Sequence, residues 1–456
     1  MSNTPKVLTS VVDNDLCIGC GLCTYVCPSN SLKMQWNDLG FLVAGIAGDC
    51  CDEGVCLTVC PFNPEEKDNN KNETGLAKSF LTEATQSDDK LGRFIGIYAG
   101  YSEKHRPTSS SGGVASYIFE PLLEKNIVDH VFSVGESRNG ETHYEYVVKS
   151  SKEELQAVSK TKYYPVTLAT VLPELHKLEG RVAVVGIACF VKALRLAQAT
   201  DPYLKQKIPF IAGIICGGVK SRFFTEYLAS KAGAQVNSFI SPEYRVKDPS
   251  STAHDYAFSC YDTVENREKL IKMKAVGDMW GTGLFKANAC DFCDDVTTEL
   301  ADISLGDAWL EPFNKDGHGT SVIITRSKAA DLLIQNGITV GNLNIDVLPR
   351  EKMLASQQGS FNHRHDGLYL RIKESNDKKI IIPQKRFGKK PLSLDLILTQ
   401  KLRRVARKNS LIIWKKKPSA VEFDKSIKRT LTLLHYVSKI ARYRRILTKR
   451  LIKVLK

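Results

Sequence analysis

The chain has 456 residues and a formal charge of +14, and this length accommodates two to four domains with at least one large buried core. Its longest apolar runs, VAVVGIACFV and IPFIAGIICGG, are shorter than the roughly 18 residues that a membrane-spanning helix needs, so no transmembrane segment is expected. The first residues, MSNTPKVLTS, lack the pattern of a secretory signal, so we expect a cytoplasmic protein in which the 13 cysteines serve metal binding, with few exceptions, rather than disulfides.

Residues 1–65 contain two cysteine runs that both end in Cys-Pro. The first run has the spacing C-x2-C-x2-C-x3-C-P of bacterial ferredoxins, which bind 4Fe-4S clusters. In the second run, Glu53 occupies the place of the second cysteine, and Cys51 is an additional cysteine. The alternating residues between the runs, SLKMQWNDLGFLV, predict a short strand pair. We therefore predict an α+β ferredoxin-like domain with two cluster sites.

The first cluster site follows from the ligand rule of two-cluster ferredoxins. In these proteins the first three cysteines of a run bind one cluster, and the fourth binds the other. The rule assigns four cysteines to the first cluster: Cys17, Cys20, Cys23 and Cys60. A zinc knuckle explains the pattern less well, because zinc sites seldom combine C-x2-C-x2-C with a second Cys-Pro pair.

The second cluster site has three clear ligands and an open fourth position. Its expected ligands are Cys27, Cys50 and Cys56, and we favour Cys51 as the fourth. Alternatively, Glu53 supplies an oxygen, a harder ligand than thiolate, or the site holds a three-iron cluster. In the last alternative the site is empty and its thiols are only packed.

The remaining chain divides into three segments. Residues 66–93 are polar and predict a linker. Residues 94–372 show a mixed α/β pattern and predict a core with a mixed sheet. Its expected strands cover 96–102, 128–137, 181–189 and 207–218, and its expected helices cover 112–126 and 190–200. Residues 373–456 predict a basic helical tail.

Four further cysteines in the core form a possible third site. Cys290 and Cys293 have C-x2-C spacing, which places two sulfurs on one metal, cluster or redox-active dithiol. Cys189 and Cys216 stand at the ends of the two buried strands, where ligands usually bind in open α/β sheets. They are the candidates for the two missing thiolates. Cys260 is expected to be a small buried hydrophobe.

The core also contains several motifs in order: RPTSSSGGVASYI, SKTKYYPV, VVGIACFVKALR, GIICGG, CDFCDDVTTELADISLGDAW and GTSVIITR. Together they resemble the family of coenzyme F-420 hydrogenase/dehydrogenase beta subunits, in which an N-terminal ferredoxin unit is common. The resemblance implies a flavoprotein with an iron-sulfur cluster beside the flavin. It also implies that Cys189, Cys216, Cys290 and Cys293 bind a third 4Fe-4S cluster. The spacing is most similar to that of bacterial members from surface-polysaccharide gene clusters.

The flavin contacts are expected in three segments. A hydroxyl- and glycine-rich loop opens directly into a helix, whose free amides suit a diphosphate, although such a loop is often only a connection. Lys160 and Lys162 are suited to neutralise phosphate or reduced flavin, or else form a solvated turn. Asp307 and Trp309 are suited to hydrogen-bond and pack against the ligand, or else form a turn. The loop residues are Ser109, Ser110, Ser111, Gly112 and Gly113. We favour FAD over FMN.

These parts predict an iron-sulfur flavoprotein oxidoreductase that exchanges electrons with a ferredoxin-type donor or redox partner subunit and a small-molecule acceptor. The expected biological setting is polysaccharide biosynthesis. The alternative is a non-catalytic electron-carrier or scaffold subunit of a larger complex. The sequence identifies no general acid or base, and His363 and His365 are expected to be exposed surface or structural residues.

The tail has 26 Lys and Arg against 5 Asp and Glu, whereas the first 372 residues carry a net charge near −7. Apolar residues recur at near-helical spacing: Ile427, Leu431, Leu434, Val437, Ile440, Leu447, Leu451 and Val454. We favour binding to an anionic membrane surface, which would place the protein peripherally on the inner face of the membrane. An acidic partner and a solvated helix that caps the core are alternatives. Nucleic acid is disfavoured because no binding motif accompanies the charge.

Overall fold

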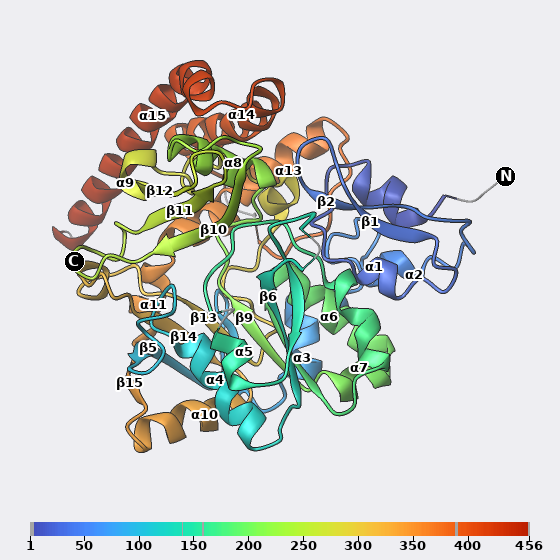
Figure 1. The fold of residues 1–456 in the computed structure, drawn as a ribbon. Helices are drawn as coiled ribbons and strands as arrows, with labels where there is room; N and C mark the ends of the chain where they lie inside the picture. The colour runs from blue at the N-terminus through green and yellow to red at the C-terminus, as the bar shows by residue number, and fades with distance from the viewer. Residues whose placement is uncertain (1–3, 139, 157–158, 388–390, 455–456) are drawn as a thin grey trace.

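The computed structural model describes residues 4–138, 140–156, 159–387 and 391–454, with side chains up to residue 447. Its main feature is an eight-stranded mixed sheet (Figure 1). In order across the sheet, the strands are β15 (Leu343–Val347), β5 (Gly96–Ser102), β14 (Ser321–Thr325), β13 (Ile303–Asp307), β9 (Phe210–Ile214), β8 (Val182–Ile187), β6 (His130–Glu136) and β7 (Tyr144–Lys149). The four strands predicted from the sequence are β5, β6, β8 and β9, and the prediction of a mixed α/β core is confirmed.

A parallel block in the middle of the sheet determines where a ligand can bind. β6, β8, β9 and β13 run parallel to one another, whereas the outer pairs are antiparallel. The carboxyl ends of these four strands therefore lie at one edge of the sheet. Ligands of open α/β sheets bind at such an edge.

Alternating apolar residues bury both faces of the sheet. On β8, Val182 and Val184 pack with α6 (Ala188–Thr200), whereas Ala183 packs with α4 (Val114–Glu124) and α10 (Lys328–Thr339). Successive strand residues point to opposite faces, so a continuous run such as VAVV serves both layers. Figure 1 shows α4 and α6 at different positions along the sheet.

The N-terminal segment packs directly on the core. It contains the hairpin β1 (Leu32–Trp36) and β2 (Leu42–Ile46) and the one-turn helices α1 (Leu22–Tyr25) and α2 (Val55–Thr58). The Leu168 amide donates to the Cys20 carbonyl at 3.0 Å, and the Ser221 hydroxyl donates to the Leu39 carbonyl at 2.6 Å. These bonds hold the cysteine-rich segment against the core at Leu168 and Ser221.

Residues 66–93 are not the expected linker. They form α3 (Glu73–Phe80) and the hairpin of β3 (Gln86–Asp88) and β4 (Gly92–Phe94). Leu76 and Leu81 are buried, and the Glu73 carboxylate accepts from the Lys192 ammonium at 3.0 Å. The segment appeared polar because its few apolar residues are widely spaced, but these residues are the ones that pack on α6.

A second layer consists of the three-stranded antiparallel sheet β10 (Phe239–Val246), β11 (Ala257–Asp262) and β12 (Arg267–Lys272), with α8 (Arg222–Lys231). The tail folds as two helices, α14 (Leu394–Lys416) and α15 (Ala420–Val454), and the apolar periodicity found in the sequence lies in α15. They cover α8, where Tyr227 contacts Trp414 and Phe423 with ring centroids 5.7 and 4.8 Å apart. The side chains of Leu451 and Val454 lie outside the described part of the chain.

The remaining helices are short connecting elements, except α13 beside the third cysteine group. They are α5 (Lys152–Gln156), α7 (Pro202–Lys207), α9 (Met273–Val276), α11 (Arg350–Ser356), α12 (Gln358–Phe361) and α13 (Leu368–Asp377). Within the described residues, every helix is too short or too polar to cross a membrane.

Candidate functional site

A cavity of about 1210 Å³ lies at the carboxyl ends of β8, β9 and β13. Its walls include Gly186 of β8, Ile214 of β9 and Asp307 of β13, so it occupies the edge that the parallel block exposes. Typical ligand pockets measure about 300–1,000 Å³. This cavity is therefore large enough for a ligand of dinucleotide size.

Most residues predicted to contact flavin line this cavity: Ser109, Ser110, Ser111, Gly113, Lys160, Lys162, Asp307 and Trp309. Gly112 lies outside its lining. A Cβ on Gly112 would lie 2.5 Å from the Gly100 carbonyl oxygen, so a glycine is needed for the loop to pass against β5. The role of these residues toward a flavin stays a prediction.

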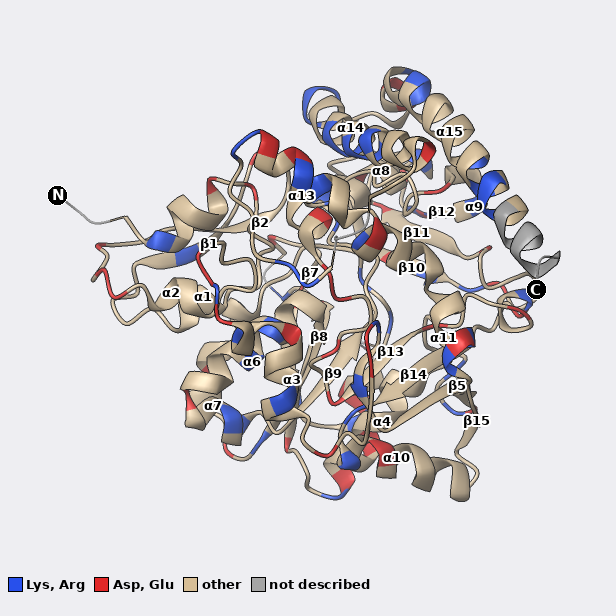
Figure 2. Ribbon diagram, turned by 180° about the vertical axis from the view of Figure 1, so that it is seen from behind, with Lys and Arg blue, Asp and Glu red and all other residues tan. Residues whose placement is uncertain are grey.

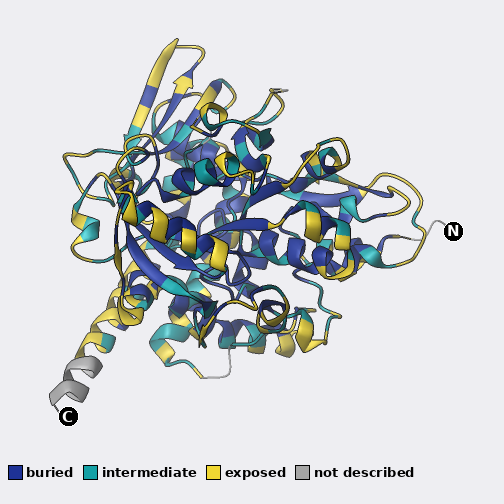
Figure 3. Ribbon diagram, turned by 90° about the horizontal axis from the view of Figure 1, so that it is seen from below, coloured by how far each residue is buried: buried dark blue, intermediate teal, exposed yellow. Residues whose placement is uncertain are grey.

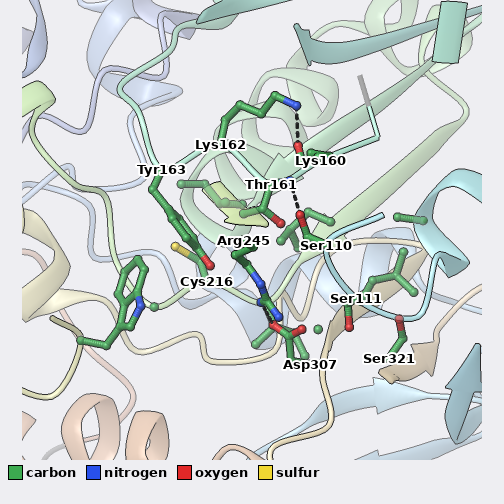
Figure 4. Close-up of a pocket in the computed structure, with 18 of the residues that line it drawn as sticks. Ser110, Ser111, Lys160, Thr161, Lys162, Tyr163, Cys216, Arg245, Asp307 and Ser321 are labelled. Carbon is green, nitrogen blue, oxygen red and sulfur yellow. Dashed lines mark hydrogen bonds and ion pairs between the residues drawn. The ribbon is translucent and has the colours of Figure 1, made fainter. Parts of the chain in front are cut away.

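Hydrogen bonds hold the serine loop to the walls of the cavity (Figure 4). The Ser110 hydroxyl accepts from the Thr161 amide at 2.9 Å, and the Ser111 hydroxyl donates to the Thr320 carbonyl at 3.1 Å. The Lys162 ammonium donates to the Lys160 carbonyl at 2.8 Å, and burial lowers the pKa of Lys162 to about 8. Burial disfavours the ammonium form, and an anionic ligand beside it would restore that form.

Arg245 is a cavity residue that sequence reasoning missed. It comes from β10 in the second sheet, and its buried guanidinium forms an ion pair with Asp307 at the end of β13 (Figure 4). Its Nε atom is buried and has no hydrogen-bond partner in the described structure. No sequence pattern marks the arginine of YRVKD as a cavity residue, because only tertiary packing brings β10 over β13.

Flat rings form another part of the lining. Trp309 stacks on His254 with centroids 4.7 Å apart, and Tyr163 meets Trp280 edge to face at 4.7 Å. The Arg245 guanidinium lies 5.3 Å from the centre of the Trp309 ring. Such surfaces suit a planar aromatic ligand.

The four cysteines predicted for the first cluster line a small closed cavity together: Cys17, Cys20, Cys23 and Cys60. Cys60 belongs to the second run, so the chain crosses over as the ferredoxin rule requires. Burial raises the pKa of Cys20 to about 12. A thiolate is costly in such a site unless a cation compensates it, as iron would.

Three of the predicted second-site cysteines are close enough to affect one another. Burial raises the pKa of Cys56, and the charges of Cys50 and Cys27 raise it further. The Cys27 sulfur lies 3.2 Å from the Ser31 hydroxyl, and the Cys50 sulfur accepts from the Asp52 amide at 3.3 Å. Cys51 and Glu53 are both exposed, so the fourth position faces solvent.

The third set of cysteines also converges. Burial raises the pKa of Cys189, and the charges of Cys293, Cys290 and Cys216 raise it further. The Cys216 sulfur accepts from the Gly218 amide and the Cys290 sulfur from the Val219 amide, each at 3.2 Å. Cys290 is in the short 3-10 helix Asn288–Phe292, where Arg371 of α13 donates to the Asp291 carbonyl oxygen at 2.5 Å and Arg407 of α14 donates to the Asn288 side chain at 2.8 Å.

Two residues connect the third set with its surroundings. Cys216 also lines the large cavity. Tyr146, another lining residue, is buried, and its pKa is raised by burial and by the charges of Cys189 and Cys20. The first and third cysteine groups are therefore neighbours, and the third adjoins the cavity.

A buried cationic residue stands beside the third group. Arg364 donates to the Cys216 and Asp295 carbonyl oxygens, and three cysteine charges raise its pKa above the usual value for arginine. The sequence FNHRHDG did not suggest this role. Of the two expectations for His363 and His365, surface or structural, the contacts agree with the structural one: His365 is buried against Phe387 with ring centroids 3.7 Å apart, and His363 lies 2.8 Å from the Lys286 ammonium.

These observations fit the expected groups. Four thiols around one enclosed space suit an iron-sulfur cluster, in which each thiolate binds a different iron. Among the described residues, no three His, Cys, Asp or Glu side chains converge closely enough to hold a single metal ion. For a flavin, the fit rests on the cavity and on two buried polar atoms in its lining that lack partners there, Arg245 Nε and Ser133 Oγ.

Three sequence-family models match the chain. Residues 97–173 match the N-terminal part, and residues 179–350 the C-terminal part, of the coenzyme F-420 hydrogenase/dehydrogenase beta subunit. Residues 10–33 match the 4Fe-4S binding domain. The 4Fe-4S match covers the first cysteine run, and the two beta-subunit matches lie in the sheet core.

Two curated relatives are named as subunits of F-420 enzymes. The chain is 26% identical over 321 residues to one of the subunits of the F(420)H(2) dehydrogenase of Methanosarcina mazei, covering 68% of this chain and 82% of the relative. It is 25% identical over 280 residues to the beta subunit of the coenzyme F-420 hydrogenase of Methanococcus voltae, covering 60% and 88%.

A chain of the F-420-reducing [NiFe] hydrogenase complex from Methanosarcina barkeri has a TM-score of 0.48 at 19% identity, covering 65% of this chain and 96% of that one. With the order of the family segments, the 4Fe-4S domain and the converging thiols, the sequence comparisons place the chain in a group of oxidoreductase subunits. The protein belongs to the family of coenzyme F-420 hydrogenase/dehydrogenase beta subunits and carries an N-terminal 4Fe-4S domain.

Proposed function

We propose that the protein is an iron-sulfur flavoprotein oxidoreductase that passes electrons between its clusters and a flavin in the large cavity. The observation that carries the proposal is the double position of Cys216, which belongs to the third cysteine group and lines the cavity. A cluster held there would adjoin any ligand of the cavity. Electron transfer between them would need no large movement of the protein.

The three cysteine groups suggest the order of the relay. Burial raises the pKa of Cys23, and the charges of Cys17, Cys20 and Cys60 and of Cys56 from the second group raise it further, so these thiols lie near one another. The charge of Cys20 in turn contributes to the raised pKa of Cys189 in the third group, so the first and third groups are neighbours. We infer an electron path from the second site through the first to the third. The exposed loop at the second site is the proposed entry for a ferredoxin-type donor or redox partner subunit.

The ligand sets are part of this proposal. The first is Cys17, Cys20, Cys23 and Cys60; the second is Cys27, Cys50, Cys51 and Cys56; the third is Cys189, Cys216, Cys290 and Cys293. The exposure of Cys51 requires its loop to turn inward when it binds iron.

The proposed flavin is FAD, because the cavity has room for a dinucleotide. A flavin accepts electrons singly or in pairs, and so links one-electron clusters to two-electron chemistry. Around it, Lys162 would neutralise negative charge, the Arg245 Nε would donate a hydrogen bond, and Trp309 and Trp280 would present flat surfaces. The serine loop would orient the phosphates, as it is fixed at Ser110 and Ser111 by hydrogen bonds.

The acceptor proposed is a small molecule, either F-420 itself or another two-electron compound, in a setting such as polysaccharide biosynthesis. A second candidate is a non-catalytic electron-carrier subunit, and it is favoured by the names of the two curated relatives, both of which are subunits. Turnover of the isolated chain with a dye acceptor and a chemical reductant supports the enzyme. Cluster reduction without dye turnover supports the carrier.

The proposal is tested by anaerobic quantification of iron, sulfide and flavin, together with EPR of the reduced protein. Three four-iron clusters require about 12 irons per chain, with one flavin. Cys216→Ser should remove the signal of the third cluster and slow flavin bleaching by reduced clusters, whereas Cys260→Ser, at a buried cysteine outside the three groups, should alter neither. Reconstituted protein without flavin would refute the flavoprotein assignment.

A further inference from the structure

The outer face of α15 carries an apolar stripe that is separate from the face packed on the body. Leu433, Tyr436, Ile440, Tyr443 and Leu447 follow one another at intervals of three and four residues, so they lie in one line along the helix. Their exposed fractions are 50, 60, 61, 57 and 58%. Single exposed apolar residues are ordinary, but five in register form a surface.

Contacts with the body fix the orientation of this stripe. Phe423, Ile427 and Leu434 of α15 are buried in the core that α8 and α14 share. Near the other end of the helix, Arg444 donates to Asp395 at the start of α14 at 2.9 Å. Because the inner face is held at both places, the helix cannot roll to bury its outer face without breaking these contacts. Figure 3 shows exposed residues along the described part of the helix that leads to the C-terminus, at the edge of the molecule.

The sequence periodicity alone suggested one apolar face for this helix. The structure divides that face, because Ile427, Leu434 and Val437 are buried whereas Ile440 and Leu447 are exposed. Leu433, Tyr436 and Tyr443 lie beside these exposed residues and complete the stripe. α15 therefore has two apolar faces, and only the inner one is occupied by the described residues.

Positive charge surrounds the stripe. Arg429 and Lys425 lie four and eight residues before Leu433 and continue its line, and Lys428 and Lys439 run beside it; all four side chains are exposed. Figure 2 shows Lys and Arg along α14 and α15, with few acidic residues among them. Two copies of α15 that met through this stripe would bring these cations together, so the charge disfavours a second copy and favours an anionic surface.

We propose that the outer face of α15 binds an anionic membrane surface, with the helix lying in the plane of the headgroups. The apolar stripe would enter the boundary of the acyl chains, and the flanking cations would contact lipid phosphates. Tyr436 and Tyr443 suit this depth, because a tyrosine ring is apolar while its hydroxyl remains hydrated. The binding is peripheral, in agreement with the absence of a spanning helix from the described residues. It would hold the redox core beside the membrane.

The test is co-sedimentation of the full-length protein, with its cofactors, with vesicles of phosphatidylcholine alone or mixed with phosphatidylglycerol. We expect binding to the mixed vesicles only, with a loss on raising the salt concentration. The triple variant Tyr436→Ser, Ile440→Ser, Tyr443→Ser should lose most of this binding, at least tenfold, and keep its fold because these side chains are exposed. Its matched control is Leu332→Ser, Val340→Ser, Val347→Ser, at apolar residues of α10, its end and β15 that are 49, 66 and 76% exposed.

A charge variant tests the cations separately. Lys425→Glu, Lys428→Glu, Arg429→Glu should abolish the preference for anionic vesicles, whereas the same change at the exposed Lys125, Lys205 and Lys328 should reduce binding much less. Equal sedimentation with both kinds of vesicle, no sedimentation, or full binding by the stripe variant would each overturn the proposal. The face would instead be assigned to a second copy if light scattering showed a dimer that the stripe variant converts to a monomer, and if no vesicle binding occurred. None of these readouts depends on flavin or electron transfer, so the inference can fail independently of the proposed function.

Discussion

The Arg245 guanidinium of β10 reaches across the cavity wall to the Asp307 carboxylate of β13, and this ion pair joins the three-stranded sheet to the main sheet. Its remaining Nε points to no partner among the described residues. The pair thus combines a structural role between two sheets with an open donor at the cavity.

Arg245→Gln should separate these two roles. Removing the guanidinium leaves the Asp307 carboxylate without its partner, so we expect the free energy of unfolding to fall by about 3 kcal/mol and the flavin content to drop. Adding Asp307→Asn removes the unpaired carboxylate charge, so the double variant should recover its free energy of unfolding but not its flavin content. Arg267→Gln on β12, in an exposed pair with Glu265, should cost less than about 1 kcal/mol. Urea unfolding and flavin absorbance measure the two effects; an unchanged flavin content in both Arg245 variants would exclude a flavin contact.

The two cysteine repeats offer a matched test of how the N-terminal unit packs on the core. Gly21 and Gly54 stand at the same place before α1 and α2, with φ of 82° and 69°. A Cβ on Gly21 would lie 2.7 Å from the Ala169 amide nitrogen, whereas a Cβ on Gly54 meets nothing closer than the Lys6 side chain at 3.7 Å. Both alanine variants should lose about 1 kcal/mol of unfolding free energy, because alanine is strained in the left-handed conformation. Gly21→Ala should lose about 1–3 kcal/mol more, because its Cβ clashes with the core. Equal losses of unfolding free energy in urea would mean that the contact with the core contributes nothing.

The sequence predicted the parts of this molecule that depend on local pattern. Ferredoxin spacing identified Cys17, Cys20, Cys23 and Cys60, which line one cavity, and apolar runs identified β8 and β9. It missed features that exist only through tertiary packing. Arg245 faces Asp307 because one sheet packs over another, and Arg364 reaches the third cysteine group from a segment 148 residues beyond Cys216. Composition also misjudged residues 66–93, because a few well-placed apolar side chains suffice to order a polar segment.

Substitutions in the second cysteine run should identify its fourth ligand. Cys27, Cys50 and Cys56 remain in Cys51→Ser and can hold three irons, so we expect the second cluster to change from a four-iron to a three-iron EPR signal. Cys50→Ser should abolish it. Adding Glu53→Cys to Cys51→Ser should restore the four-iron signal, because it re-creates the regular spacing. The first cluster serves as the internal control. A second-cluster spectrum that Cys51→Ser leaves unchanged would assign the fourth position to another group.

The charge of Lys162 should make flavin binding depend on pH. Burial lowers its pKa to about 8, so the ammonium is lost as the pH rises through about 8, and flavin affinity should decrease there. Unfolded lysine keeps its proton up to its ordinary pKa of 10.5, so between about pH 8 and 10.5 this group makes folding more favourable as pH rises, and it has no further effect above that window. Lys162→Met removes the buried charge, and we expect it to stabilise the protein near pH 7 by on the order of 1 kcal/mol while weakening flavin binding. Lys162→Arg should retain binding above pH 8. Flavin fluorescence titrations at several pH values measure the effect; parallel curves for all three proteins would contradict it.

The Arg364 guanidinium should raise the reduction potential of a cluster held by the third cysteine group. It is buried and bonded to the Cys216 carbonyl oxygen, and reduction adds negative charge beside it. Arg364→Gln removes that compensation, so we expect the midpoint potential of the third cluster to become more negative and electron delivery to the cavity to slow. Arg364→Lys keeps the charge and should recover most of the potential, although it cannot bond to both carbonyl oxygens with the same geometry. An EPR-monitored redox titration resolves the clusters, and the first cluster should keep its potential in both variants. If all clusters shift together, the substitution has changed the packing rather than the local charge.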